Sequence, residues 1–221
     1  YHKEVKAPWE HYNRAPCAAP FYEIEDSIKD ISRALSNVAK FSEVMPLIII
    51  VDNGSSQEDL LGIKQGKVHG AEFIVVDHHF FEKDVISSEV LVHINPFLVG
   101  EDGTHFSAGM LCSEFSRFIN EETDTSHIPA LAGLADRIKN PSVMETYLKL
   151  AEKHGYDESM LKDIGALIDY VSAKVRFMEA REYIEVVFGE PIAKQKALIA
   201  LMAPHLKKQE ETSLKIAQLA A

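Results

Sequence analysis

The sequence predicts an α/β protein: a parallel sheet built on a βαβ core, followed by a helical C-terminal region. Residues 47–51 and 73–76 are short, uninterrupted apolar runs, and the segment between them has helical character. Such runs are typical of strands buried on both faces of a parallel sheet. A strand–helix–strand unit of this length places its strands in parallel, with a right-handed crossover. We expect an α/β core in residues 1–140 and a helical region in residues 141–221.

The chain is expected to open with irregular structure and then a helix. Residues 1–22 contain several prolines and no clear periodicity. Apolar side chains at helical spacing predict a helix over about 23–41, and the first strand follows it.

A turn and a helix are expected between the first two strands. Residues 52–56, Asp-Asn-Gly-Ser-Ser, end the first strand. Either Ser55 with Glu58 or Ser56 with Asp59 has the spacing of a capping box, in which two side chains cap the start of a helix. This spacing predicts a helix that ends before the second strand.

After the second strand, the pattern predicts one more short strand, over 90–94, and then only helices. Ser107 could cap a helix that reaches about Ile119. Pro129 suits the first turn of a helix that ends near Ile138. The remaining helices are expected at about 141–154, 157–188 and 191–220.

Composition excludes several classes of protein. The 221 residues include 34 acidic and 23 basic side chains, a net charge of −11. This charge argues against a protein that coats duplex DNA, although an acidic metal site would still suit a nucleic-acid enzyme. Cys17 and Cys112 fit no zinc spacing, so we expect reduced thiols in a cytoplasmic protein. No apolar run approaches the ~18 residues of a membrane span, and no membrane partner is expected.

Acidic and imidazole side chains follow two neighbouring strands. Asp52 comes directly after the first strand, and Asp77, His78 and His79 come directly after the second. Ligands of open parallel sheets bind beyond the carboxyl ends of the strands. Taken alone, Asp52 could be a turn residue and the histidines a surface pair. Their expected convergence at one edge favours a metal site with carboxylate and imidazole ligands.

Several sequence blocks resemble the DHH phosphoesterase superfamily, which includes RecJ-type single-strand exonucleases, oligoribonucleotide phosphodiesterases and a class of inorganic pyrophosphatases. The narrower likeness is to the archaeal RecJ-like exonuclease family. A DHH string alone is a weak signal, but several blocks in the order of the family are a strong one. The blocks lie at residues 19–26, 51–59, 75–80, 95–100, 107–109 and 132–137.

The resemblance implies a role for each matching residue. Asp52 matches an acid that bridges two divalent ions, and His78 and Asp136 match further metal ligands. Asp77 matches an acid that orients its neighbours, and His79 matches the histidine that faces the substrate phosphate. The local sequence agrees in part with a ligand role for Asp136. This acid lies late in an apolar segment, where an uncompensated carboxylate is costly. The local alternative is a helix-end acid paired with its neighbouring arginine.

The implied reaction is two-metal hydrolysis of phosphodiester bonds with Mn²⁺ or Mg²⁺, on single-stranded DNA or RNA. Ser107 and Gly109, at a helix start, and His105 just before it are expected to lie near the substrate. Replication or repair proteins are further expected partners. The oligomeric state, the preference for DNA or RNA and the direction of digestion are not predicted.

Two family features are not found in this sequence. The first motif, a His-x-Asp-x-Asp-Gly-like string, is missing, and so is a C-terminal accessory domain with a Gly-Gly-His motif. We therefore expect the chain to be a fragment of a nuclease that alone binds Mn²⁺ weakly and hydrolyses DNA poorly or not at all. The alternatives are a non-catalytic replication or repair scaffold and a phosphoesterase for small molecules.

Overall fold

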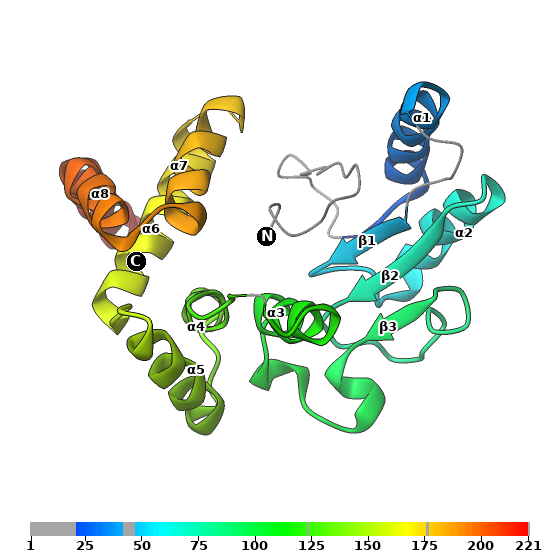
Figure 1. Cartoon of the computed structure of the whole chain (residues 1–221), viewed down its shortest axis with the longest axis horizontal. Coiled ribbons are helices and arrows are strands. Elements are labelled where there is room, and N and C mark those ends of the chain that lie inside the picture. Colours follow the sequence, from blue (N-terminus) through cyan, green and yellow to red (C-terminus); the bar gives the residue numbers. More distant parts are fainter. Residues whose placement is uncertain (1–20, 42–46, 123, 176, 221) are drawn as a thin grey trace.

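The computed structural model describes residues 21–41, 47–122, 124–175 and 177–220 (Figure 1). It confirms the predicted fold class, because a parallel sheet with flanking helices leads into a region made only of helices. The irregular segment expected at 1–22 lies outside the described residues, except for its last two.

The sheet has three strands in the order β1-β2-β3: β1 (Leu47–Val51), β2 (Glu72–Val76) and β3 (Val92–Ile94). Both pairs of neighbours are parallel, as the βαβ prediction requires. Val76 is aligned with Val51 on one side and with Ile94 on the other. The three strands therefore finish together, and the residues after them meet at one edge of the sheet.

Two helices cover one face of this sheet. They are α1 (Ile24–Phe41) and α2 (Leu60–Val68), and they pack against each other. The buried side chains between them and the strands form one cluster, called the sheet core below. It contains Tyr22, Ile31, Ile50, Ile63, Ala71, Phe73, Val75 and Ile86.

The capping box predicted before α2 is present. A 3-10 turn, η1 (Gln57–Asp59), leads into the helix. The Asp59 carboxylate accepts hydrogen bonds from the backbone and hydroxyl groups of Ser56, both at 2.8 Å. It also accepts one from the backbone N–H of Tyr22 at 2.6 Å. The buried acid thus fixes the start of α2 and holds the segment before α1 against it.

The expectation that the first strand is buried on both faces is wrong. Ile50 points into the sheet core, but Leu47, Ile49 and Val51 on the opposite face are each about half exposed. The same face of β2 is covered: Ile74 and Val76 are buried, and helix α3 (Ala108–Ile119) packs against this strand. Within the described part of the chain, β1 pairs with β2 alone, so it is an edge strand there.

The segment after β3 turns back toward the sheet edge. It forms two short 3-10 helices, η2 (Pro96–Val99) and η3 (Gly103–His105), before α3 begins. Ser107 is the N-cap of α3, as predicted: its side chain accepts a hydrogen bond from the backbone of Met110. The next helix, α4 (Ile128–Ala135), ends three residues earlier than expected.

The remaining helices are α5 (Pro141–Lys153), α6 (Glu158–Lys174), α7 (Phe177–Gly189) and α8 (Ile192–Ala220). The single helix expected at 157–188 is wrong, because two helices occupy this stretch. Val175 has extended backbone angles and caps the end of α6, which stops the first helix. Nothing in the local sequence marks this break, since neither glycine nor proline lies at it.

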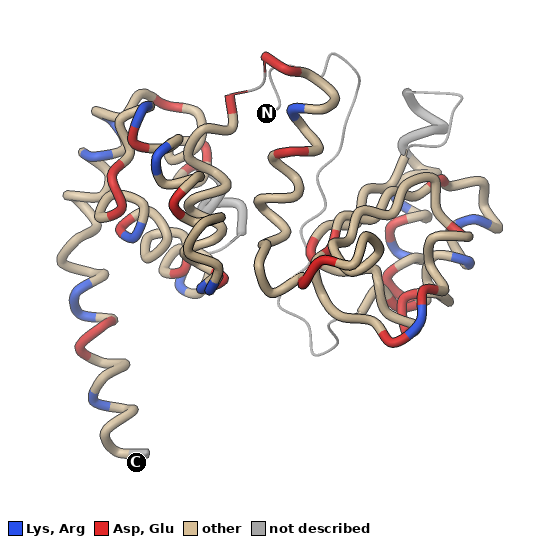
Figure 2. The backbone as a smooth tube through the Cα atoms, turned by 90° about the horizontal axis from the view of Figure 1, so that it is seen from below, with Lys and Arg blue, Asp and Glu red and all other residues tan. Residues whose placement is uncertain are grey.

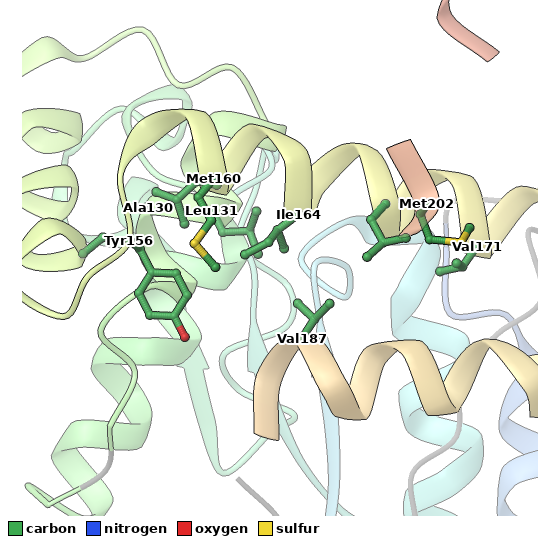
Figure 3. Packing of buried hydrophobic residues seen from close by; sticks show 11 residues of the cluster. Ala130, Leu131, Tyr156, Met160, Ile164, Val171, Val187 and Met202 are labelled. Carbon is green, nitrogen blue, oxygen red and sulfur yellow. The ribbon is translucent and has the colours of Figure 1, made fainter. Parts of the chain in front are cut away.

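A second cluster of buried side chains, called the helical core below, joins α4 to α6, α7 and α8 (Figure 3). Ala130 and Leu131 of α4 pack there beside Ile164 of α6 and Val187 of α7. Helix α4 also packs against α3, so it connects the helical core with the sheet side of the molecule. The boundary predicted between residues 140 and 141 stays a prediction.

The second half of α8 extends away from the other helices (Figure 2). Leu214, Ile216 and Leu219 on it are more than half exposed. No helix in the described ranges has both the length and the apolarity that a membrane span needs.

Candidate metal centre

Two hydrogen bonds beyond the strands place the first acidic residues. The backbone N–H of Asp52 donates to Val76 at 3.0 Å, and that of Asp77 donates to Ile94 at 2.9 Å. Each bond continues the sheet by one residue past the end of a strand. Asp52 and Asp77 therefore leave the same edge, as the sequence predicted.

The backbone bends sharply at this edge. Asp52 has a φ of 62° and Arg137 a φ of 55°, and they are the two non-glycine residues with positive φ in the described part of the chain. The left-handed region is costly for side chains other than those of Asn and Asp. Such backbone conformations cluster at functional sites. Asp52 is a predicted ligand, and Arg137 directly follows the predicted ligand Asp136 in the sequence.

The His78 ring is held between a carboxylate and a backbone carbonyl. Its Nε2 lies 3.3 Å from Oδ1 of Asp52. Its Nδ1 lies 3.3 Å from the carbonyl oxygen of Gly103, to which an N–H at Nδ1 donates. The hydrogen bond with Asp52 is the main cause that raises the pKa of His78 to about 9, against the effect of burial. Metal-binding histidines commonly have their second nitrogen bound in this way, which fixes the ring and the tautomer.

Gly103 makes the second contact possible because it lacks a side chain. A Cβ on this buried residue would lie 2.1 Å from the carbonyl oxygen of His78. No backbone atom tolerates that distance, so a larger residue would push the two segments apart. The turn before α3 is thereby packed directly on the DHH segment.

Asp77 is buried and organises the two histidines that follow it. One carboxylate oxygen accepts hydrogen bonds from the backbone of His78 at 2.8 Å, the backbone of His79 at 3.3 Å and Nδ1 of His79 at 2.7 Å. Burial acts to raise the pKa of Asp77, but hydrogen bonds from His79 and Ser55 hold it below its usual value. The bond with Asp77 likewise raises the pKa of His79. Asp77 thus fixes the His79 ring through Nδ1, and among the described residues no hydrogen bond engages Nε2.

The structure brings three of the predicted residues into one potential ligand group. Each of Asp52, His78 and His79 offers an oxygen or ring nitrogen, and these atoms all lie within 4.8 Å of one another. Carboxylate oxygens and imidazole nitrogens suit divalent ions such as Mn²⁺, so the donor set fits the predicted metal.

Asp136 lies near this group without being part of it. It forms the C-terminal cap of α4. Partial burial and the negative charge of Asp52 raise its pKa, and the charge of His78 opposes this rise. Asp136 is exposed at the end of the apolar segment of α4, so its carboxylate is only partly removed from solvent. Its ligand role stays a prediction.

The residues predicted to meet the substrate have clear packing roles. The buried Ser107 hydroxyl accepts a hydrogen bond from the Met110 backbone at 3.3 Å. Gly109 lies where α3 crosses α4, since a Cβ there would be 2.4 Å from that of Ala132. His105 is half buried at the end of η3. Their contact with substrate stays a prediction.

Sequence reasoning missed a set of polar side chains behind Asp77. Ser55, His93 and Asn95 come from three separate segments and are joined by hydrogen bonds. A weak signal was available in β3, where His93 interrupts an otherwise apolar strand just before an Asn-Pro pair. A polar residue at such a position usually has a buried partner.

Two known proteins resemble this chain along nearly its whole length. An uncharacterised protein of Methanocaldococcus jannaschii is 34% identical, over 96% of this chain and 30% of that protein. A solved structure, described as the DHH domain of a member of the S1p family of ribosomal proteins, matches with a TM-score of 0.82. It is 35% identical, over 97% of this chain and 52% of that one. No protein-family model matches the chain.

This chain thus spans about a third of one relative and half of the other. The structural match extends through both the sheet and the helices after it. Together with the Asp-His-His segment at the edge of the sheet, the match supports membership of the DHH superfamily. The chain has the α/β fold of a DHH-type domain with a helical C-terminal region.

Proposed function

We propose that the protein to which this chain belongs hydrolyses phosphodiester bonds in single-stranded DNA or RNA with Mn²⁺ or Mg²⁺. The observation that carries the proposal is the group of Asp52, His78 and His79 at the carboxyl edge of the sheet. The likeness to a DHH domain supports a phosphoesterase, and the resemblance of the sequence blocks to RecJ-like exonucleases supports a nuclease.

Each side chain has a distinct task in this proposal. Asp52 and His78 hold metal, and Asp136 adds a carboxylate from α4. His79 faces the phosphate through Nε2, because Asp77 occupies its Nδ1. Bound divalent ions supply charge stabilisation to the phosphate and make water a stronger nucleophile.

The arrangement of the histidines supports catalysis over a scaffold role. His78 and His79 are fixed by hydrogen bonds to a carbonyl and a carboxylate. A protein that serves only as a scaffold would not need histidine rings held in one orientation. A fixed orientation of the ligands contributes strongly to metal affinity and rate in metal sites.

The test is degradation of a labelled single-stranded oligonucleotide, with Mn²⁺ added or removed by a chelator. We expect metal-dependent hydrolysis by a protein of the relatives' length, and little or none by residues 1–221 alone. His78→Ala should abolish it, because the substitution removes a ligand. Asp163→Asn, at an exposed acid of α6, is the matched control and should keep full activity.

Two outcomes would contradict the proposal. Mn²⁺ binding without hydrolysis of any oligonucleotide would favour the scaffold. Hydrolysis of a small phosphate ester or pyrophosphate, with oligonucleotides left intact, would favour a small-molecule enzyme.

A further inference from the structure

A row of aromatic rings leads from the interior of the sheet side to its surface. The centre of the Phe81 ring lies 5.9 Å from that of His93 and 6.4 Å from that of Phe97. The Phe97 ring in turn lies 5.4 Å from the Phe80 ring. The side chain of His93 is 2% exposed, Phe81 and Phe97 are partly buried, and Phe80 is 69% exposed. The row therefore ends in a ring that is open to solvent.

Phe97 supports this last ring. Its plane makes an angle of 86° with the Phe80 ring and of 82° with the Phe81 ring. Such edge-to-face contacts are a favoured geometry for pairs of aromatic side chains. An edge-to-face neighbour covers at most one face of a ring, so Phe80 keeps a flat apolar face toward solvent.

Contacts place Phe80 close to the candidate ligands. Phe80 directly follows His79 in the sequence. A Cβ on Gly103 would lie 2.6 Å from the Phe97 ring, and the carbonyl oxygen of Gly103 lies 3.3 Å from Nδ1 of His78. The Phe97 ring thus packs on the same turn that holds the His78 ring. Phe80, which packs on Phe97, lies at the border of the candidate metal centre.

The place of Phe80 in the fold distinguishes it from other exposed apolar side chains. Single exposed apolar residues are common on protein surfaces and need no ligand. In the described ranges, the other phenylalanines that are at least 40% exposed are Phe118 and Phe188, near the ends of α3 and α7. Phe80 instead follows β2 at the carboxyl edge of the sheet, where open parallel sheets bind their ligands.

The charge of the chain favours an uncharged contribution to nucleic-acid binding. The net charge of −11 repels a polyanion, so attraction to the phosphates by the chain as a whole cannot supply affinity. Stacking of a base on an aromatic ring needs no charge. It also tolerates any sequence, because every base has a π face.

We propose that Phe80 is a stacking platform for a nucleobase of the substrate, beside the phosphate that His79 faces. This inference rests on the proposed function for the class of substrate, a single-stranded nucleic acid, and adds how that class is recognised. A flat apolar ring at this border favours a ligand that carries a base over pyrophosphate or another phosphate ester without one.

The first experiment compares two probes by isothermal titration calorimetry, with a protein of the relatives' length and Ca²⁺ in place of Mn²⁺ to limit hydrolysis. One probe is a short single-stranded oligodeoxyadenylate, and the other has the same length and backbone but lacks all bases. Phe80→Ala should weaken binding of the first probe about 5- to 100-fold, as loss of one stacked base does, and leave the affinity for the second unchanged. A merely structural role would weaken both equally.

Two further variants test the chemistry of the ring. Phe80→Trp should keep the affinity for the base-bearing probe, whereas Phe80→Leu, which is apolar but not aromatic, should lose most of it. Phe118→Ala is the matched control, because it removes an exposed phenyl ring at the far end of α3, and it should change neither affinity. Equal loss for both probes in Phe80→Ala, or no loss for either, would overturn the proposal.

The second experiment measures hydrolysis of the oligonucleotide with Mn²⁺. Phe80→Ala should raise KM by about the same factor as it weakens binding, while kcat stays close to that of the unaltered protein, because Phe80 holds no metal. A fall in kcat with KM unchanged would assign the ring to support of the histidines and would contradict the stacking role.

The two proposals fail in different ways. If the unaltered protein binds the base-bearing probe through Phe80 but hydrolyses no oligonucleotide, the proposed function fails and the platform stands. If the unaltered protein hydrolyses oligonucleotides but Phe80→Ala binds both probes as the unaltered protein does, the platform fails and the proposed function stands.

Discussion

The sheet core and the helical core differ in the buried polar groups around them, and we expect each core to have a different role. The sheet core is flanked by buried carboxylates, Asp59 and Asp77, and by the polar network behind the metal centre. In the described part of the chain no buried acid flanks the helical core, which consists mainly of aliphatic side chains, and the polar groups buried against its Tyr156 are Gln195 and His127. Buried polar groups with all partners satisfied fix one arrangement, whereas apolar packing contributes stability without direction. We therefore expect the sheet side to fix the positions of the candidate ligands and the helical side to contribute stability.

The largest expected effects come from truncating each core. Phe73 of β2 and Leu161 of α6 are both fully buried. Phe73→Ala should lower the free energy of unfolding by about 3–5 kcal/mol and Leu161→Ala by about 2–5 kcal/mol. Chemical denaturation measures both losses. Only Phe73→Ala should also weaken Mn²⁺ binding by the folded chain, because β2 carries the Asp-His-His segment.

Electron paramagnetic resonance of Mn²⁺ provides the second measurement, under conditions in which both variants stay folded. If Leu161→Ala weakens binding as much as Phe73→Ala does, the proposed division between geometry and support is wrong.

Substituting glycine by alanine is expected to change stability by a smaller amount, with opposite signs on the sheet side and the helical side. Gly103→Ala forces a Cβ against the His78 carbonyl and should cost about 1–3 kcal/mol, as overpacking does. Gly165, inside α6, would place its Cβ 3.8 Å from Leu131, which is ordinary contact. Gly165→Ala should stabilise the chain by about 0.5–1 kcal/mol, because alanine favours helix. Thermal unfolding of the two variants gives the comparison, and equal signs would refute it.

The smallest effect is a dependence of stability on pH that belongs to the sheet side. The folded pKa of His78, about 9, lies above the ordinary value of 6.5. A raised pKa means that protonated His78 stabilises the metal-free fold below pH 6.5, and that this contribution is lost as the pH rises through about 9. Asp52 is largely exposed, so solvent screens the pair and the effect stays modest.

Denaturation of the metal-free chain on both sides of this pH window tests the effect. His78→Gln should remove part of the decline in stability. His69→Gln, at an exposed histidine of the helix end, should leave the decline unchanged. An identical decline in all three proteins would show that His78 plays no part in it.

The parts of the fold that the sequence predicted are those that local pattern determines. The strands, the capping box at Ser56 and the cap at Ser107 each depend on a few neighbouring residues. The meeting of Asp52 with His78 also followed, because parallel strands in a βαβ unit bring their carboxyl ends together.

The parts that the sequence did not predict depend on contacts between distant segments. An apolar run such as Leu47–Val51 is compatible with a strand that is covered on one face or on both. The sequence therefore could not predict that one face of β1 is exposed. The break between α6 and α7 lacks a helix-breaking residue. The bond between Ser55 and His93 joins positions 38 residues apart, and only the register of β3 beside β2 brings them together.

The position of α4 has a consequence for how the molecule responds to a ligand. One end of this helix is anchored among the side chains of the helical core, and its other end carries Asp136 toward Asp52 and His78. A cation shared by Asp136 and Asp52 would act as a clamp between two bodies that have separate cores. Thermodynamic linkage is reciprocal. If the bound cation opposes separation of the helices from the sheet, separation of the helices must lower the affinity for the cation by the same free energy. The affinity of the site would then report the spacing of the two halves.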